Sequence, residues 1–147
     1  MAYRLKQVGT SQRPYEDSRA LEKVWFPANK YPRQIAAGDL LVIYAVGWKR
    51  FPAIVKVLTP AGKLSDDSNR HPEWGAIYPW GMKVKPVLRL SVDDAPTASD
   101  CGFNVGRIQN GNTYLKLDAE EFGVIRQALL DRQAELLYER SSAAALR

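Results

Sequence analysis

The stretch LLVIYAV at residues 40–46 decides the fold of this chain. Its seven consecutive apolar residues, bounded by turn residues, predict a strand that is buried on both faces. The next four residues, GWKR, predict a turn, and AIVKVL at residues 53–58 predicts the returning strand. The two strands form a hairpin, which we expect at the centre of a β-sheet.

Three further segments extend this sheet. Residues 3–8 (YRLKQV) and 113–117 (TYLKL) predict short strands, and the second of them follows an Asn-Gly turn signal. Residues 82–90 (MKVKPVLRL) alternate apolar with basic residues, as a half-exposed strand does, and Pro86 indicates an edge, a bulge or a break. A long polar connection at residues 60–79 precedes this strand, and such connections are often functional.

The sequence also predicts helices. Residues 16–24 and 32–38 predict two short helical pieces, and one long helix is expected to begin after Asp118. Glu121 stands three residues after Asp118, which is the spacing of a capping box. We expect this helix to end near the tail, residues 141–147, which we expect to be disordered.

Together these elements predict one α+β domain over residues 1–147. About five or six strands most economically close into a β-barrel, because closure removes exposed sheet edges. The expected architecture is therefore a PUA-like β-barrel with short helices and a longer C-terminal helix.

Composition excludes several classes of protein. One cysteine (Cys101) and one histidine (His71) cannot supply an intrachain disulfide, nor the three or four ligands of an ordinary Cys/His zinc site. No apolar run reaches the roughly 18 residues of a membrane span. The first residues lack the apolar run of a signal peptide. We expect no metal, no cofactor, no membrane partner and a cytoplasmic location.

Charge is divided unevenly along the chain. Residues 20–90 carry eleven Lys and Arg against five Asp and Glu, whereas residues 91–147 carry six against nine. A basic middle beside an acidic end favours a polyanion that docks on one side, and the alternative is ordinary solvated charge. The candidates for contact with a nucleic-acid backbone are Lys30, Arg33, Lys49, Arg50, Arg70, Lys83, Lys85 and Arg107.

Four tryptophans stand at the ends of the expected elements. Trp25 ends the first short helix, Trp48 lies in the hairpin turn, and Trp74 and Trp80 flank the end of the long connection. Indoles at such places can line a pocket mouth, and stacking on an aromatic face contributes about 1–3 kcal/mol per nucleobase. The amide of Asn29 can read a base edge. The alternative is that the tryptophans cap the ends of a small barrel core.

The order of these features resembles the EVE and YTH domains of the PUA-like superfamily. The clearest matches are WFPAN at residues 25–29 and IAAGDLLVIYA at residues 35–45. EVE domains similarly place an aromatic residue and an asparagine before a Gly-Asp pair, an apolar run and a tyrosine. Further similar segments follow in the same order at residues 53–58, 78–85, 92–96 and 103–130.

The resemblance implies a barrel with an aromatic pocket that takes a flipped-out or single-stranded modified base. It places the pocket at the segment before the apolar strand, at the end of that strand and at a loop aromatic. From the resemblance and the tryptophan positions together, the candidate base-binding residues are Trp25, Phe26, Asn29, Tyr44, Ala45, Trp48, Trp74 and Trp80.

Two departures from the family pattern bear on the ligand. After Tyr44 the sequence reads Ala-Val-Gly-Trp instead of the Ser-containing ending common in EVE domains, and the region near Arg107 lacks the Arg-Asp pair typical of YTH domains. Both departures argue against N6-methyladenine. They leave 5-methylcytosine, its oxidised forms or another modification open, in DNA or in RNA.

We therefore expect a reader of a modified nucleobase, acting alone or with a separate effector protein such as a nuclease, and no catalytic residues. One alternative is a general RNA-binding module of the PUA or ASCH type, and another is a protein-interaction module that uses the C-terminal helix. A small hydrolase or nuclease is a further alternative. It is disfavoured because the acidic pairs 66–67 and 93–94 are adjacent residues, which point opposite ways in an extended chain. A Cys101 nucleophile would also need His71 beside it.

Overall fold

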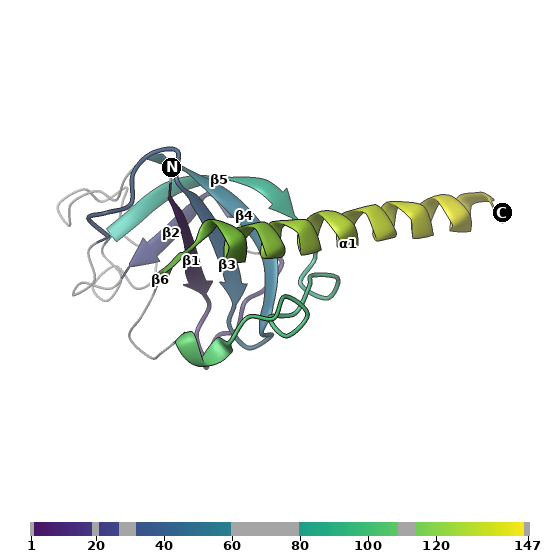
Figure 1. The fold of residues 1–147 in the computed structure, drawn as a ribbon, viewed down its shortest axis with the longest axis horizontal. Coiled ribbons are helices and arrows are strands. Elements are labelled where there is room, and N and C mark those ends of the chain that lie inside the picture. Colours follow the sequence, from purple (N-terminus) through teal and green to yellow (C-terminus); the bar gives the residue numbers. More distant parts are fainter. Residues whose placement is uncertain (1, 19–20, 27–31, 60–79, 109–113, 146–147) are drawn as a thin grey trace.

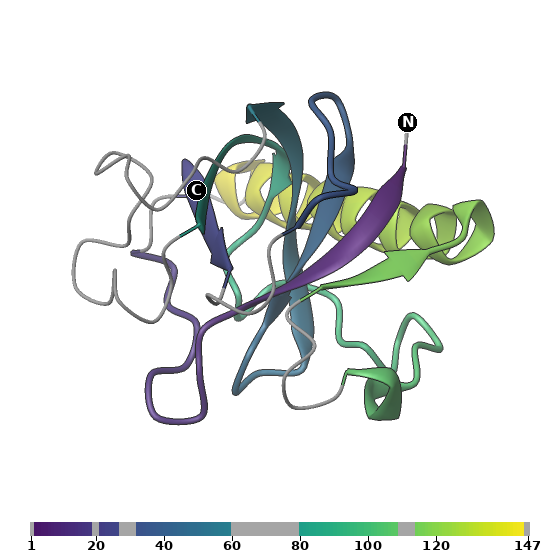
Figure 2. The ribbon, with the colours of Figure 1, turned by 90° about the vertical axis from the view of Figure 1, so that its left-hand side faces the viewer.

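The computed structural model describes residues 2–18, 21–26, 32–59, 80–108 and 114–145. Six strands form one curled sheet in the order β2-β5-β4-β3-β1-β6, and a long helix crosses one face of it (Figures 1 and 2). This is the α+β, barrel-like fold that the sequence predicts. The elements are β1 (Tyr3–Val8), β2 (Lys23–Phe26), β3 (Leu40–Ala45), β4 (Arg50–Thr59), β5 (Trp80–Arg89), the 3-10 turn η2 (Val105–Arg107), β6 (Tyr114–Leu117) and α1 (Ala119–Ala145).

The predicted hairpin is confirmed at the centre of the sheet. β3 pairs antiparallel with β4 on one side and parallel with β1 on the other. Leu41, Ile43 and Ala45 point into the interior of the curled sheet, while Val42 and Tyr44 point to the face that carries α1. The apolar run is continuous because a strand covered on both faces has no side that must meet water.

Helix α1 begins with the predicted capping box. The backbone N–H of Glu121 donates to Asp118 Oδ1 at 2.7 Å, and the N–H of Asp118 donates to Glu121 Oε1 at 3.1 Å. Phe122, Ile125 and Leu129 bury one face of the first half of α1 against the sheet. Among the described residues, no helix is both long and apolar enough to cross a membrane.

The prediction for the tail is wrong over residues 141–145, which continue α1 to Ala145. The helix can run on because the sequence after Gly123 contains neither Gly nor Pro, and alanines, the best helix formers, stand near its end. Residues 146–147 lie outside the described residues. In Figure 1 the last turns of α1 extend well beyond the sheet.

The two short helices predicted early in the chain are also wrong. Residues 23–26 form strand β2, which pairs antiparallel with β5. Val24 and Phe26 alternate into the core, and this period of two decides the structure over the helix propensity of the preceding residues. Residues 32–38 form turns, in which the Ile35 N–H donates to the Pro32 carbonyl.

The turn before β3 carries a buried ion pair. Arg4 Nη1 donates to Asp39 Oδ2 at 2.9 Å, and both side chains are less than a tenth exposed. Asp39 also accepts from the backbone N–H groups of Ala2 and Ala36. Burial alone would raise the pKa of Asp39, but these hydrogen bonds and the Arg4 charge outweigh it and lower the pKa. The Gly38-Asp39 pair therefore ties the start of β3 to β1.

Candidate functional site

An aromatic cluster lies where the two edge strands of the sheet approach each other. The rings of Phe26, at the end of β2, and Tyr114, at the start of β6, meet edge to face with centroids 5.4 Å apart. Trp80, at the start of β5, is the cross-strand partner of Phe26, and residues directly opposite in a sheet share a face. We call Phe26, Trp80 and Tyr114 the closure cluster, because they join the first and last strands of the sheet order.

A buried lysine extends into the closure cluster from β1. The Nζ atom of Lys6 lies 4.9 Å from the centre of the Phe26 ring and donates to the Gln7 carbonyl at 2.7 Å. Only 6% of Lys6 is exposed. A desolvated ammonium over an aromatic face gains about 2 kcal/mol.

The closure cluster combines one fully buried ring with two half-buried rings. Phe26 is fully buried, whereas Trp80 and Tyr114 are half-buried against the same interior core. Flat rings that keep part of their surface open can stack on a planar ligand, and a cation beside them can donate to its polar edge. The arrangement suits a flat, polar-edged molecule such as a nucleobase.

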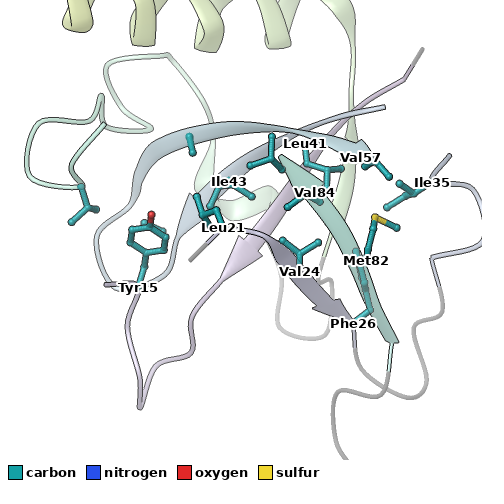
Figure 3. Close-up of a cluster of buried hydrophobic side chains, with 14 residues drawn as sticks. Tyr15, Leu21, Val24, Phe26, Ile35, Leu41, Ile43, Val57, Met82 and Val84 are labelled. Carbon is teal, nitrogen blue, oxygen red and sulfur yellow. The ribbon is translucent and has the colours of Figure 1, made fainter. Parts of the chain in front are cut away.

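Three candidates from the sequence lie elsewhere. Tyr44 points to the helix-covered face, where its ring contacts Phe51 and burial raises the pKa of its hydroxyl. Ala45 faces the interior core. Trp48 lies in the β3–β4 turn, and its Nε1 donates to the Tyr15 carbonyl at 2.9 Å. Figure 3 shows Tyr15 and Phe26 at opposite ends of the interior core, so Trp48 does not share a site with Phe26.

Trp25 is next to Phe26 in β2 but points the other way. Successive side chains of a strand alternate between faces, so Trp25 lies on the outer face of the sheet, opposite Gly81 of β5. The structure therefore brings together Phe26 and Trp80 from the predicted set. Asn29 and Trp74, together with the basic candidates Lys30 and Arg70, lie outside the described residues.

Two basic candidates are engaged in holding the fold. Arg50 Nη1 donates to the carbonyls of Asp93 at 2.6 Å and Ala95 at 3.2 Å, and so fixes the loop after β5. Arg107 pairs with Glu121 in the capping box and lies 5.1 Å from the Phe103 ring centre. The other basic candidates among the described residues, Arg33, Lys49, Lys83 and Lys85, are exposed.

Sequence reasoning missed Lys6 and Tyr114. In YRLKQV the alternation of residue types indicates that Leu5 is buried and that Lys6 is exposed to water. In the structure β1 is covered on both faces, so Lys6 is buried as well. Tyr114 reaches Phe26 through the curl of the whole sheet. Neither residue gives a local signal that would have identified it.

Of the residues considered for hydrolysis, the structure describes Cys101 and the acidic pair 93–94. Burial and the neighbouring Asp100 raise the pKa of Cys101 to about 11, so its thiol is protonated near neutral pH. His71 lies outside the described residues. Within the described ranges, no three His, Cys, Asp or Glu side chains are grouped so as to hold a metal ion.

Comparisons with known proteins support the fold and give no information on the function. No protein-family model matches the chain, and no curated protein sequence matches it. A hypothetical protein from Leishmania major is 18% identical, with a TM-score of 0.55 over 90% of this chain and 97% of that protein. A crystal structure of a protein from Agrobacterium tumefaciens is 13% identical, with a TM-score of 0.57 over 87% of this chain and 93% of that protein. An NMR structure of a protein from Rhodopseudomonas palustris is also 13% identical, with a TM-score of 0.53 over 88% of this chain and 93% of that protein. The same arrangement of strands and helix therefore recurs in solved proteins of very different sequence.

Proposed function

We propose that this chain is a nucleic-acid-binding domain of the EVE/PUA-like type that recognises a modified nucleobase, such as a modified cytosine, at the closure cluster. The observation that supports this function is the buried Lys6 ammonium 4.9 Å from the Phe26 ring centre, with Trp80 and Tyr114 beside that ring. A protein binds an extruded base by stacking on aromatic side chains and by hydrogen bonds to the edge of the base.

The energetics of such a site are favourable for an extruded base. Unstacking a base costs a few kcal/mol, and stacking on Trp80 or Tyr114 returns about 1–3 kcal/mol. A charge-assisted hydrogen bond from Lys6 to a ring nitrogen or carbonyl oxygen adds about 1.5–3 kcal/mol. A methyl or hydroxymethyl group on the base adds contact with the aromatic walls, and this contact is the source of selectivity.

The exposed lysines of β5, Lys83 and Lys85, favour a second candidate function. Lysines that contact only phosphates hold nucleic acid of any sequence, since phosphate contacts carry no base information. A general RNA-binding module would therefore use these lysines and leave the closure cluster as core packing.

A titration separates the two functions. The full chain is mixed with oligonucleotides, as DNA and as RNA, that carry one unmodified, 5-methylated, 5-hydroxymethylated or N6-methylated base, at fixed salt. We expect binding at least about tenfold tighter for one modification, a difference of about 1.4 kcal/mol. Equal affinity for all oligonucleotides would instead support the general module.

Matched tryptophan variants locate the site. Trp80→Ala removes a wall of the closure cluster, so we expect it to abolish the preference for the modified base. Trp48→Ala removes an indole at the other end of the interior core and should keep the preference. Loss of the preference in Trp48→Ala alone would contradict the proposed site.

A further inference from the structure

Four lysines gather on the outer face of three adjacent strands. Lys23 of β2 is the cross-strand partner of Lys83 of β5, and Lys56 of β4 is the partner of Lys85 of β5. All four point outward, because the residues that alternate with them, such as Val24, Val57 and Val84, lie in the interior core. We call Lys23, Lys56, Lys83 and Lys85 the lysine face.

The lysine face is open among the described residues. Lys56, Lys83 and Lys85 are exposed and Lys23 is half-buried. Helix α1 packs against β1 and β4 and buries Ile54 there, but two residues further along β4 Lys56 is exposed. None of the ion pairs in the described part of the chain involves Lys56, Lys83 or Lys85.

The charged residues of these three strands are all basic. Strands β2, β4 and β5 contain no Asp or Glu. Polar residues of any charge would suit a solvent-exposed sheet surface, so solvation alone does not require lysines. Like charges directly opposite each other across strands destabilise a sheet. Lysines also protect exposed edges from aggregation, but β4 and β5 are inner strands of the sheet order. The pair Lys56 and Lys85 therefore lowers stability between two inner strands, where protection of an edge is not needed, whereas Lys23 lies on the edge strand β2.

From this arrangement we infer that the lysine face binds the phosphodiester backbone of the nucleic acid whose base enters the closure cluster. Three adjacent strands span about 10 Å and two residues along a strand about 7 Å, an area wide enough for neighbouring phosphates. The lysine face and the closure cluster share the edge strand β2, in which Lys23 is outward and Phe26 inward. This inference rests on the proposed function, because it assigns a binding surface to the backbone of the nucleic-acid strand whose base is bound.

The test is the salt dependence of binding. For a single strand, the slope of log affinity against log salt changes by about 0.7 for each phosphate contact. We expect Lys83→Gln with Lys85→Gln to reduce the slope by about 1.4 in a labelled single-stranded oligonucleotide. Relative to 1 M salt, this loss weakens binding about 25-fold at 0.1 M.

A control removes the same charge from elsewhere on the molecule. Lys116 on β6 and Arg126 on α1 are exposed, so Lys116→Gln with Arg126→Gln lowers the net charge equally. This control should leave the slope nearly unchanged. An equal change of slope in both double variants would overturn the inference, because net charge alone would then explain the binding.

A second ligand separates this inference from the proposed function. Binding of the free modified nucleoside should be the same in the lysine variant and the wild type, because a nucleoside carries no phosphate. Salt-dependent oligonucleotide binding that needs Lys83 and Lys85 but shows no base preference would support the lysine face and contradict base reading. Base preference with an unchanged slope would contradict the lysine face alone. Binding to anionic phosphatidylserine vesicles but not to oligonucleotides would overturn both.

Discussion

Two aromatic regions of this protein, one on each side of the sheet, differ in what accompanies their rings. On the helix side, Tyr3 stacks on Phe122 with centroids 4.2 Å apart, and Phe51 meets Phe103 edge to face at 5.7 Å. The closure cluster instead joins the ends of strands from both edges of the sheet and holds a buried cation, Lys6. Aromatic content alone therefore does not mark a binding site.

The cations of the two regions show the same contrast. On the helix side, Arg107 lies over Phe103 but is paired with Glu121 at the surface. In the closure cluster the Lys6 ammonium donates to the Gln7 carbonyl, and the side chain is buried. The two cations therefore differ in burial, since Arg107 lies at the surface and Lys6 in the interior.

The largest expected effect is on stability, from the helix side. Phe122→Ala removes a ring that is stacked on Tyr3 and buried under α1. We expect the free energy of unfolding to fall by about 3–5 kcal/mol, as for other buried Phe→Ala changes. Urea denaturation measures this loss, and base binding by the folded protein should be unchanged. A loss below about 1 kcal/mol would mean that α1 does not complete the core.

The next effect concerns the ion pair that holds β1, the strand that carries Lys6. Asp39→Asn leaves Arg4 buried without its carboxylate, which costs about 3–5 kcal/mol. Because the pKa of Asp39 is lowered in the folded protein, its stabilisation is complete above its ordinary pKa of 3.8 and is lost as the pH falls through the lower folded value. Urea titrations at several acidic pH values should show that loss in the wild type and not in Asp39→Asn.

A smaller effect, on binding alone, sharpens the comparison. Lys6→Met keeps most of the side-chain volume but removes the charge-assisted donor. We expect stability to change by no more than about 1.5 kcal/mol, and affinity for the modified nucleoside to fall about 10- to 100-fold. Lys116→Met on the surface of β6 is the matched control and should change neither the stability nor the affinity for the nucleoside. Unchanged affinity in a folded Lys6→Met protein would remove Lys6 from the site.

The smallest effect is expected where α1 extends past the sheet. Tyr138 is 74% exposed, in contrast to the buried Phe122 in the same helix. Tyr138→Ser should change the free energy of unfolding by less than about 0.5 kcal/mol, as is usual for surface substitutions. Urea denaturation would contradict this view of the helix if the loss approached that of Phe122→Ala.

Much of the fold could be predicted from local patterns. The apolar run of β3, the returning strand β4 and the capping box of α1 are set by neighbouring residues, and all three are confirmed. The sequence predicts a helix where β2 forms, because the preceding residues favour helix, while the pairing of β2 with β5 depends on a distant segment.

The candidate site was harder to predict for the same reason. Phe26 and Trp80 could be named as aromatic residues at element ends, but the partnership of Phe26 with Tyr114 and Lys6 exists only after the sheet curls. Trp48 and Tyr44 were indistinguishable from them in sequence. The structure places Trp48 at a far turn and Tyr44 on the helix face.

The most direct test of the central claim is a chemical-shift map of the full chain with a modified nucleoside. Amide and side-chain signals are followed while 5-methyl-2′-deoxycytidine, or whichever modified nucleoside binds most tightly, is added. We expect saturable shifts at Lys6, Phe26, Trp80 and Tyr114, with little change at Tyr44, Trp48 and Phe122. Shifts centred on Trp48 or on the helix side, with the closure cluster unaffected, would contradict the central claim.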